Sequence, residues 1–247
     1  MLKNYKNFLD TLLEKIENDE DVNENGDGTT KTSLTNNVLS VEQKEINLKV
    51  SKKIRQCLLI IHTKYGFFAN LLYKLKIKQS MPGDGVNTMA TDSISLIYNP
   101  NWVMKLTQDE ILFVLCHEVM HCALMHMFRR GDKDHETWNS AADYAINLLV
   151  EGIGKMPDKG LYDVKYKNMS TEQIYEYLIN NPSEKPKTKG GDPGDYGPGD
   201  PNDLPQSDIR NPGSLSDKGE EILPSQTGQK SELEEASKGK LEEIWKE

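Results

Sequence analysis

The sequence lacks any apolar run close to the roughly 18 residues that a membrane-spanning helix requires. Asp10 interrupts the only N-terminal candidate, residues 8–13, which is too short for the apolar core of a signal peptide. Cysteine is also scarce: three residues are too few for a disulfide framework, and we expect all three to be reduced and buried. The sequence therefore predicts a cytoplasmic protein that makes no contact with a membrane.

Basic residues are too few for a protein whose main partner is nucleic acid. Lys and Arg number 30 against 39 Asp and Glu, which gives a net charge of −9. Proteins that neutralise phosphates carry a basic surface instead. The only basic block covers residues 44–80, with nine basic side chains against one acid. We interpret this block as a solvated face rather than as a site for an anionic partner.

Apolar spacing and turn residues divide the chain into elements that predict an α+β fold. Helical spacing is clearest over residues 41–62 and over the run after Thr107, which forms a T-x-x-E capping box with Glu110. Shorter segments bounded by Gly, Pro and Asp are typical of strands. The predicted helices cover residues 1–20, 41–62, 108–130, 138–150 and 171–178, and the predicted strands cover 73–78, 87–91 and 94–98.

Composition sets the boundaries of the predicted domains. A central domain over residues 41–180 follows an N-terminal helix and polar loop over 1–40. Residues 182–213 contain seven Pro and six Gly but only three apolar side chains to bury, so this segment cannot offset the entropy of ordering its chain. We therefore predict a disordered linker over 181–213 and an acidic tail over 214–247 that has no core of its own.

The pattern H-E-x-x-H stands within the predicted helix 108–130, as His117, Glu118 and His121. A spacing of four places both imidazoles on one helix face, close enough to share a tetrahedral zinc ion at about 2.0–2.1 Å. Glu118 lies roughly 100° round the helix, where a carboxylate is suited to take a proton from an activated water. The alternative is a pair of buried histidines that have hydrogen-bond partners and no metal.

A catalytic zinc site usually takes three protein ligands, and the predicted helix 138–150 offers the third. Asp143 stands between Asn139 and Asn147 at spacings of four on an otherwise apolar helix, 22 residues after His121. A turn and an antiparallel return of this helix would bring its carboxylate to the imidazoles, with either Asn as a hydrogen-bond partner. A structural carboxylate is the alternative for Asp143. Less well placed candidates are His126, His135, Glu136 and Glu151.

Two of these motifs together resemble a known family. The run His117–His121 and the run Trp138–Asn147 are similar to the bacterial and phage metallopeptidase domain that often precedes a von Willebrand factor A-like domain. Other segments that fit the same family are Thr91-Asp92, Tyr98-Asn99-Pro100, Thr107 to Glu110, His126 and Ser170 to Leu178, so the resemblance covers about residues 41–180. Ser93 stands where the family commonly has Gly.

The resemblance implies a zincin-like fold, in which the strands of residues 87–98 lie beside the active-site helix and an extended substrate adds to the sheet edge. It further implies that His117 and His121 bind zinc, that Glu118 is the catalytic acid and base, and that Asp143 is the third ligand. The acidic tail would then lead toward a further domain.

We therefore predict a zinc-dependent metallopeptidase that acts on a peptide or protein substrate, with Glu118 passing a proton to the leaving amine. Tyr98, Tyr144 and Tyr162 are candidates, by residue type alone, for the donor that stabilises the oxyanion. The alternative is a zinc-bearing interaction module whose linker and acidic tail recruit a protein partner, such as an ATPase, without hydrolysis. A DNA-associated protease is a third reading that depends only on the basic block.

Overall fold

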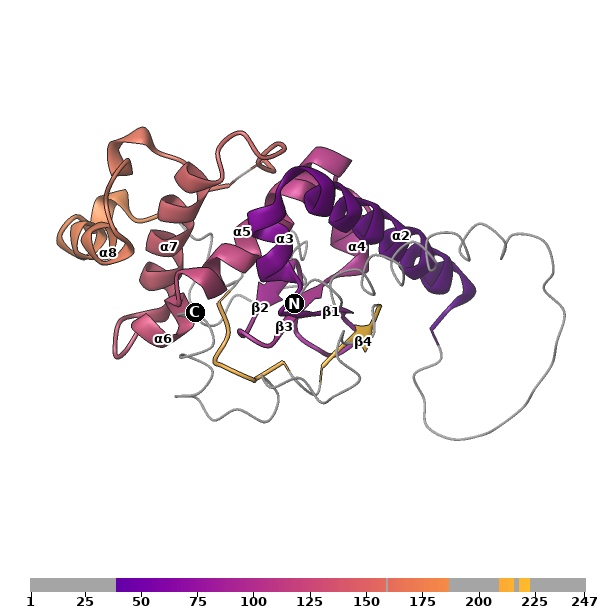
Figure 1. The fold of residues 1–247 in the computed structure, drawn as a ribbon. Coiled ribbons are helices and arrows are strands. Elements are labelled where there is room, and N and C mark those ends of the chain that lie inside the picture. Colours follow the sequence, from indigo (N-terminus) through magenta and orange to yellow (C-terminus); the bar gives the residue numbers. More distant parts are fainter. Residues whose placement is uncertain (1–38, 159, 187–208, 216–217, 223–247) are drawn as a thin grey trace, which may run out of the picture.

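A computed structural model describes residues 39–158, 160–186, 209–215 and 218–222 (Figure 1). These residues form a helical fold with one small mixed sheet, which confirms the predicted α+β class. The predicted helix over residues 1–20 lies outside the described residues. The elements are α2 (Val41–Lys64), α3 (Gly66–Leu72), β1 (Lys76–Gln79), β2 (Met89–Thr91), β3 (Ser95–Tyr98), α4 (Pro100–Val103), α5 (Gln108–Ala123), α6 (His126–Arg129), α7 (His135–Leu149), the 3-10 turns Val164–Tyr166 and Pro182–Glu184, α8 (Thr171–Asn180) and β4 (Glu220–Glu221).

Helix α2 begins at an N-cap serine, Ser40, whose side chain accepts a hydrogen bond from the Gln43 amide. Its apolar stripe is buried as the spacing predicts, with Ile54 and Ile61 fully inside the main core. The basic block is not solvated throughout, because Arg55 and Lys78 are both buried. That part of the prediction is wrong: residue type gives charge, but the packing of neighbouring elements decides exposure.

The sheet has four strands in the order β2-β3-β1-β4. Strand β3 pairs in parallel with β1 and antiparallel with β2, while β4 adds antiparallel to the far side of β1. The β2–β3 turn is held by Asp92, whose Oδ1 accepts the amides of Ile94 and Ser95. Ser93 has φ 72°, a left-handed conformation that favours Gly. The positive φ at residue 93 therefore gives a physical reason for the Gly that the similar family commonly has there.

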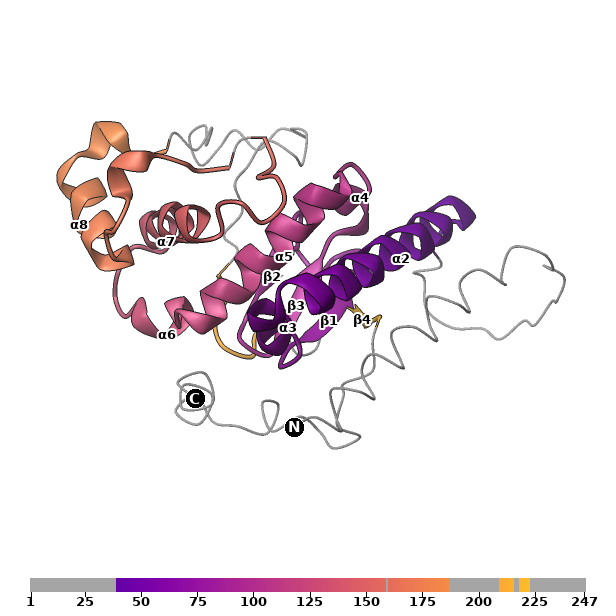
Figure 2. The same cartoon turned by 45° about the horizontal axis from the view of Figure 1, so that its top comes forward.

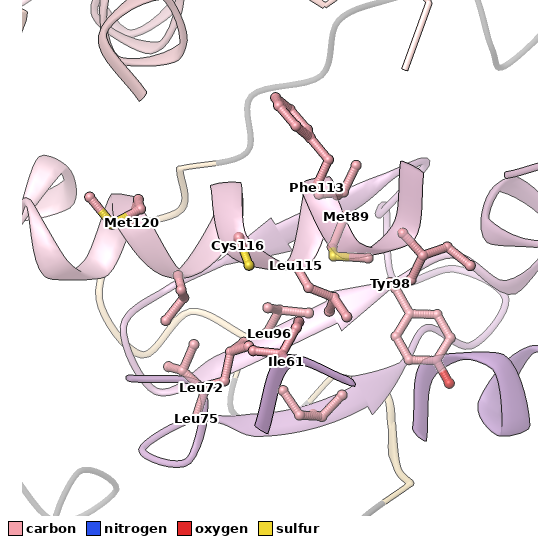
Figure 3. Close-up of a cluster of buried hydrophobic side chains, with 14 of the residues drawn as sticks. Ile61, Leu72, Leu75, Met89, Leu96, Tyr98, Phe113, Leu115, Cys116 and Met120 are labelled. Carbon is pink, nitrogen blue, oxygen red and sulfur yellow. The ribbon is translucent and has the colours of Figure 1, made fainter. Parts of the chain in front are cut away.

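Side chains alternate between the two faces of the sheet. Met89, Leu96 and Tyr98 enter the main core beneath α5 (Figure 3). Ala90 and Ile97 point the other way and form a separate cluster, completed by Val86 and Leu215. Both faces of the sheet are therefore covered, one by helices and the other by loop residues.

Helix α5 begins with the predicted capping box, in which Thr107 and Glu110 exchange hydrogen bonds. It ends at Ala123 rather than at residue 130, because Met125 adopts a left-handed conformation with φ 55°. The side chain of Arg129 donates to the Leu124 carbonyl at the break, and the short helix α6 then leaves in a new direction. The predicted uninterrupted helix is thus wrong in its last seven residues, since no Gly or Pro marks the break.

Two buried faces distinguish α5 from an ordinary amphipathic helix. Leu115 points toward the sheet and Phe113 points away from it (Figure 3). Both are at least 95% buried, because α7 packs on the face opposite the sheet. Figures 1 and 2 both show α7 between α5 and α8. Helix α7 starts at His135, three residues before the predicted position, with Asp134 as its N-cap. Helix α8 has the predicted Ser170–Gln173 capping box.

Residues 209–215 and 218–222 lie along the sheet, from one edge to the other. Ile209 forms a bridge with Thr91 at the β2 edge, Leu215 packs beneath the sheet, and β4 pairs with β1 at the opposite edge. Figure 1 shows this path as the gold trace below the strands. We call residues 209–215 the strap.

The strap and residues 218–222 lie where composition predicts a disordered linker and a tail without a core of its own, and they contact the core of the central domain. Ile209, Leu215 and Ile222 are all at least 94% buried, and the ammonium of buried Lys78 donates to the carbonyls of Leu215 and Lys218. Composition averages over a whole segment, so it does not register three widely spaced apolar residues that each meet an existing apolar surface. The remaining residues of the predicted linker and tail, 187–208, 216–217 and 223–247, lie outside the described part.

The cysteine prediction is confirmed. Cys57, Cys116 and Cys122 are free and buried, and burial raises the pKa of each thiol to about 12. None is therefore a thiolate at neutral pH. Among the described residues, no helix is long and apolar enough to cross a membrane.

A close backbone contact locks the loop after α7 onto the first turn of α5, and it can be tested by substitution. A Cβ at Gly154 would lie 2.2 Å from the Asp109 carbonyl oxygen, whereas one at Gly152 would meet nothing within 4 Å, although both have positive φ. We expect Gly152→Ala to lower the free energy of unfolding by about 1 kcal/mol. Gly154→Ala should lower it by roughly 3 kcal/mol, because overpacking adds to the backbone strain. Chemical denaturation of both variants measures the difference, and equal losses would contradict the contact.

Candidate metal centre

Three side chains from two helices converge on one buried point. His117 and His121 come from α5 and Asp143 from α7, and one ligand atom from each lies within 4.8 Å of the others. The two Nε2 atoms are 2.9 Å apart. Asp143 Oδ1 lies 3.7 Å from His117 Nε2 and 3.4 Å from His121 Nε2. The structure therefore brings together the three residues that the sequence predicts as metal ligands.

These separations match the size of a tetrahedral zinc site. With ligands at about 2.0–2.1 Å and tetrahedral angles, neighbouring donor atoms lie about 3.3 Å apart. The observed distances of 2.9, 3.4 and 3.7 Å bracket that value. Two imidazoles and one carboxylate are also a donor set typical of catalytic zinc. The cluster can thus hold a small divalent ion without rearrangement of the helices.

The two carboxylate oxygens of Asp143 differ in their hydrogen bonds. Oδ2 accepts a hydrogen bond from the Asn139 amide at 3.1 Å, while Oδ1 is buried and accepts no hydrogen bond from the described residues. Burial raises the pKa of Asp143 to about 6, against the lowering effect of His117. The oxygen without a hydrogen-bond donor is the one that faces the two imidazoles.

The outer nitrogen of His117 is fixed by a chain of two hydrogen bonds. The side-chain amide of Asn147 donates to the Leu161 carbonyl at 2.8 Å, which turns its Oδ1 toward His117 Nδ1, also at 2.8 Å. Because an amide oxygen only accepts, Nδ1 must carry the proton. The Nε2 of a neutral His117 then presents a lone pair to the cluster.

A second chain supports His121. Its Nδ1 lies 3.1 Å from His126 Nδ1, and His126 Nε2 lies 2.9 Å from the Thr171 hydroxyl. Burial, with His121 as the next cause, holds the pKa of His126 well below its usual value, so this ring is neutral. A neutral His126 protonated on Nε2 accepts the Nδ1 proton of His121, so that Nε2 of His121 presents its lone pair to the cluster.

Glu118 is 98% buried on α5, directly after His117. The ring of Phe113 stacks on His117 with centroids 6.3 Å apart. Solvent reaches the cluster only at its margin, since the side chains of His117 and Asp143 are 8% and 11% exposed and that of His121 is fully buried. A metal ion here would sit in surroundings of low dielectric, where electrostatic effects are strong.

The other candidates occupy different places. His135 bonds the Ile209 carbonyl, and Glu136 is exposed. His126 serves as the hydrogen-bond partner of His121. Glu151 accepts from the Tyr162 hydroxyl. Among the remaining tyrosines considered for the oxyanion, Tyr98 is in the main core and Tyr144 packs on Tyr166.

Sequence reasoning found Asn139 and Asn147 as supporting residues but missed Thr171 and Leu161. Thr171 is the first residue of α8, and its local signal, the capping box, concerns the helix end alone. Leu161 acts through its backbone carbonyl, which no side-chain pattern can reveal. Both contacts depend on folding back over a distance in the chain, since α8 returns to His126 of α6 and the loop after α7 returns to Asn147 of α7.

Comparison with known proteins identifies relatives of this chain. It matches the model of a family described as “Putative metallopeptidase domain” over residues 49–246. An uncharacterized protein of Thermotoga maritima is 30% identical over 108 residues, which are 42% of this chain and 27% of the relative. The match thus spans little more than a quarter of that relative's length. No solved structure matches the chain. The family match includes the three clustered residues and the strap.

The Asn147 contact predicts a change in metal affinity. Asn147→Ala removes the acceptor that orients His117, and loss of such a partner typically costs roughly 10–100-fold in affinity. Competition titration of zinc against a chromophoric chelator measures this loss. Asn180→Ala, which removes an exposed amide from α8, is the matched control and should bind zinc as the wild type does. Equal affinities in the two variants would show that Asn147 does not orient a ligand.

Proposed function

This chain belongs to the family of the metallopeptidase domain, and on that premise we propose that it is a zinc-dependent peptidase. The observation that carries the proposal is the convergence of His117, His121 and Asp143 on one buried point, with the outer nitrogen of each histidine held by another residue. In this proposal the three side chains bind the metal and Glu118 acts on the proton.

The residues present fit a metal ion. Oδ1 of Asp143 is a buried carboxylate oxygen without a hydrogen-bond donor, and leaving such an atom unpartnered is costly. The lone pairs of two imidazole nitrogens face the same point in the arrangement that satisfies Asn147 and Thr171. A cation at this point offsets both costs. Two nitrogens and one oxygen in tetrahedral spacing favour zinc over magnesium or calcium, which prefer sets made of oxygen.

A bound metal supplies a Lewis acid that activates a water molecule for attack on a peptide carbonyl. The carboxylate of Glu118 accepts the proton that this water loses, and then delivers it to the nitrogen of the leaving amine. Asn139 keeps Asp143 in place through Oδ2. Asn147 and His126 hold the two imidazoles in the tautomers that the site needs.

We further propose that the fold is zincin-like. In support, α5 lies against the sheet with β2 as its neighbouring strand, and α7 returns across it with the third ligand. Because β2 is the edge strand on this side of the sheet, an extended peptide would have a backbone edge to pair with close to the cluster.

Metal content tests the ligand set. Elemental mass spectrometry of the purified protein should find close to one zinc per chain in the wild type. Asp143→Ala removes the third ligand and should reduce this content sharply. Asp132→Ala, which removes an exposed carboxylate from the loop before α7, should keep it. Wild-type protein that is folded, contains no metal and cannot be reconstituted would rule out the proposal.

Glu118→Gln separates catalysis from metal binding. The variant should retain its zinc, because Glu118 is not a ligand, while hydrolysis of an unfolded protein substrate such as labelled casein should fall by about 10²–10⁴-fold. Glu136→Gln neutralises an exposed glutamate of α7 and should leave the rate unchanged. If Glu118→Gln is as active as the wild type, Glu118 is not the proton carrier. If the zinc-loaded wild type cleaves nothing, the interaction-module alternative is favoured.

A further inference from the structure

The strap lies on the edge of β2, beside the proposed metal centre. Ile209 forms a parallel bridge with Thr91, and the Arg210 amide donates to the Thr91 carbonyl at 2.9 Å. Further along, the Gly213 amide donates to the Asp92 carbonyl at 3.2 Å and the Leu215 amide to Asp92 Oδ2 at 2.6 Å. The strap thus pairs with the β2 edge through its backbone, as a bound peptide would.

Helix α7 binds both polar groups of the Ile209 backbone. The Ile209 amide donates to Asn139 Oδ1 at 3.2 Å, and the Ile209 carbonyl accepts from His135 Nε2 at 3.0 Å. The other end of the Asn139 amide donates to Asp143 Oδ2. A single side chain therefore connects the strap with the proposed third metal ligand. Asn139 alone therefore separates the strap from the cluster.

Recognition of this kind depends on main-chain groups and so does not require a particular sequence. An exposed strand edge presents unpaired N–H and C=O groups that another extended segment can satisfy. Here the Thr91 carbonyl accepts a hydrogen bond from the Arg210 amide. Asn139 accepts from the amide of Ile209, and His135 donates to its carbonyl. Any extended peptide offers the same groups. The side chain of Ile209 adds an apolar contact, because it is 98% buried in the main core cluster.

We infer that the β2 edge is a binding site for an extended peptide with an apolar side chain, and that the strap is a built-in occupant which a peptide must displace. The inference that the displaced state is the active one rests on the proposed peptidase function. The strap then acts as an internal inhibitor, because a substrate cannot lie along β2 while Ile209 and Arg210 occupy it.

Residues 209 and 210 are held at β2 by the bridge to Thr91, by the buried Ile209 side chain and by hydrogen bonds to Asn139, His135 and the Gly85 carbonyl. Pro212 and Gly213 then turn the chain, with Gly213 at φ 74°. The Ile209 carbonyl is bound by His135, so the strap does not offer that carbonyl for hydrolysis. Residues 218–222 are held separately, because the Ile222 amide donates to the carbonyl of Ile77 in β1, on the other side of the sheet from β2.

Binding of the strap sequence in trans tests the site. Ile209→Asp places a charge where an apolar side chain is buried in the core, and Arg210→Pro removes the amide that donates to the Thr91 carbonyl; each should free the edge in the otherwise unchanged chain. A fluorescent peptide of residues 205–217 should then bind at least about tenfold more tightly than it binds the wild type, where an internal segment competes at an effective concentration on the order of millimolar. Fluorescence anisotropy measures this binding, and it requires no catalysis.

Matched controls separate this edge from general loosening. Ile222→Asp places the same charge in residues 218–222, and Arg210→Ala keeps the amide that Arg210→Pro removes; both should bind the peptide as weakly as the wild type. A peptide in which the residue equivalent to Ile209 is Asp should not bind any variant. If Ile209→Asp and Arg210→Pro are folded and bind no peptide, the inference is wrong.

If both variants fail to fold, hydrogen exchange of the wild-type protein tests whether the strap can leave the β2 edge. A displaceable strap opens locally, so the Arg210 amide should exchange at least about tenfold faster than the core amides of α5. Exchange at the α5 rate would show a permanent part of the core and overturn the inference.

Casein hydrolysis by the zinc-loaded variants completes the experiment. Ile209→Asp should cleave several-fold faster than the wild type, and the trans peptide should inhibit it. Peptide binding without hydrolysis in any variant would support the peptide site and disprove the proposed peptidase instead.

Discussion

Burial of α5 on both faces is the constraint on which the remaining elements depend. One face is apolar and packs on the sheet, but the other carries imidazoles whose nitrogens lose water when α7 covers them. A buried polar atom without a partner costs about 1–3 kcal/mol, so each nitrogen must find one within the fold. The outer nitrogen of His117 finds Asn147 of α7, which is itself fixed by the Leu161 carbonyl, and that of His121 finds His126, which is fixed by the first residue of α8.

These partners explain the arrangement of elements that have little apolar surface of their own. Helix α6 is a single turn, yet it places His126 beside Nδ1 of His121. It also brings Arg129 to Glu172 of α8, where two guanidinium nitrogens donate to the carboxylate. The pair joins α6 to α8 and so keeps Thr171 close to His126. A site made only of His117, His121 and Asp143 would leave the orientation of each ring open; the surrounding hydrogen bonds fix it before any metal arrives.

The sequence predicts those features that local patterns encode. Capping boxes at Thr107 and Ser170 mark the starts of α5 and α8, and the spacing of His117, His121 and Asp143 predicts a meeting that the structure shows. The roles of these residues, and that of Glu118, remain predictions. Features that depend on distant contacts are missed. The break at Met125, the burial of Lys78 and the docking of Ile209 each require a partner far away in the chain, which no window of sequence contains.

The position of the strap in the sequence determines when it becomes available to the sheet during synthesis. Every residue of the metal cluster and its supporting contacts, as far as Thr171, precedes Ile209 by at least 38 positions. At about 5–20 residues per second, the ribosome delivers the strap several seconds after the last of these groups. The residues that form the β2 edge and the cluster are therefore delivered before the segment that occupies the edge, so a nascent chain that folds as it emerges passes through a stage in which that edge is open.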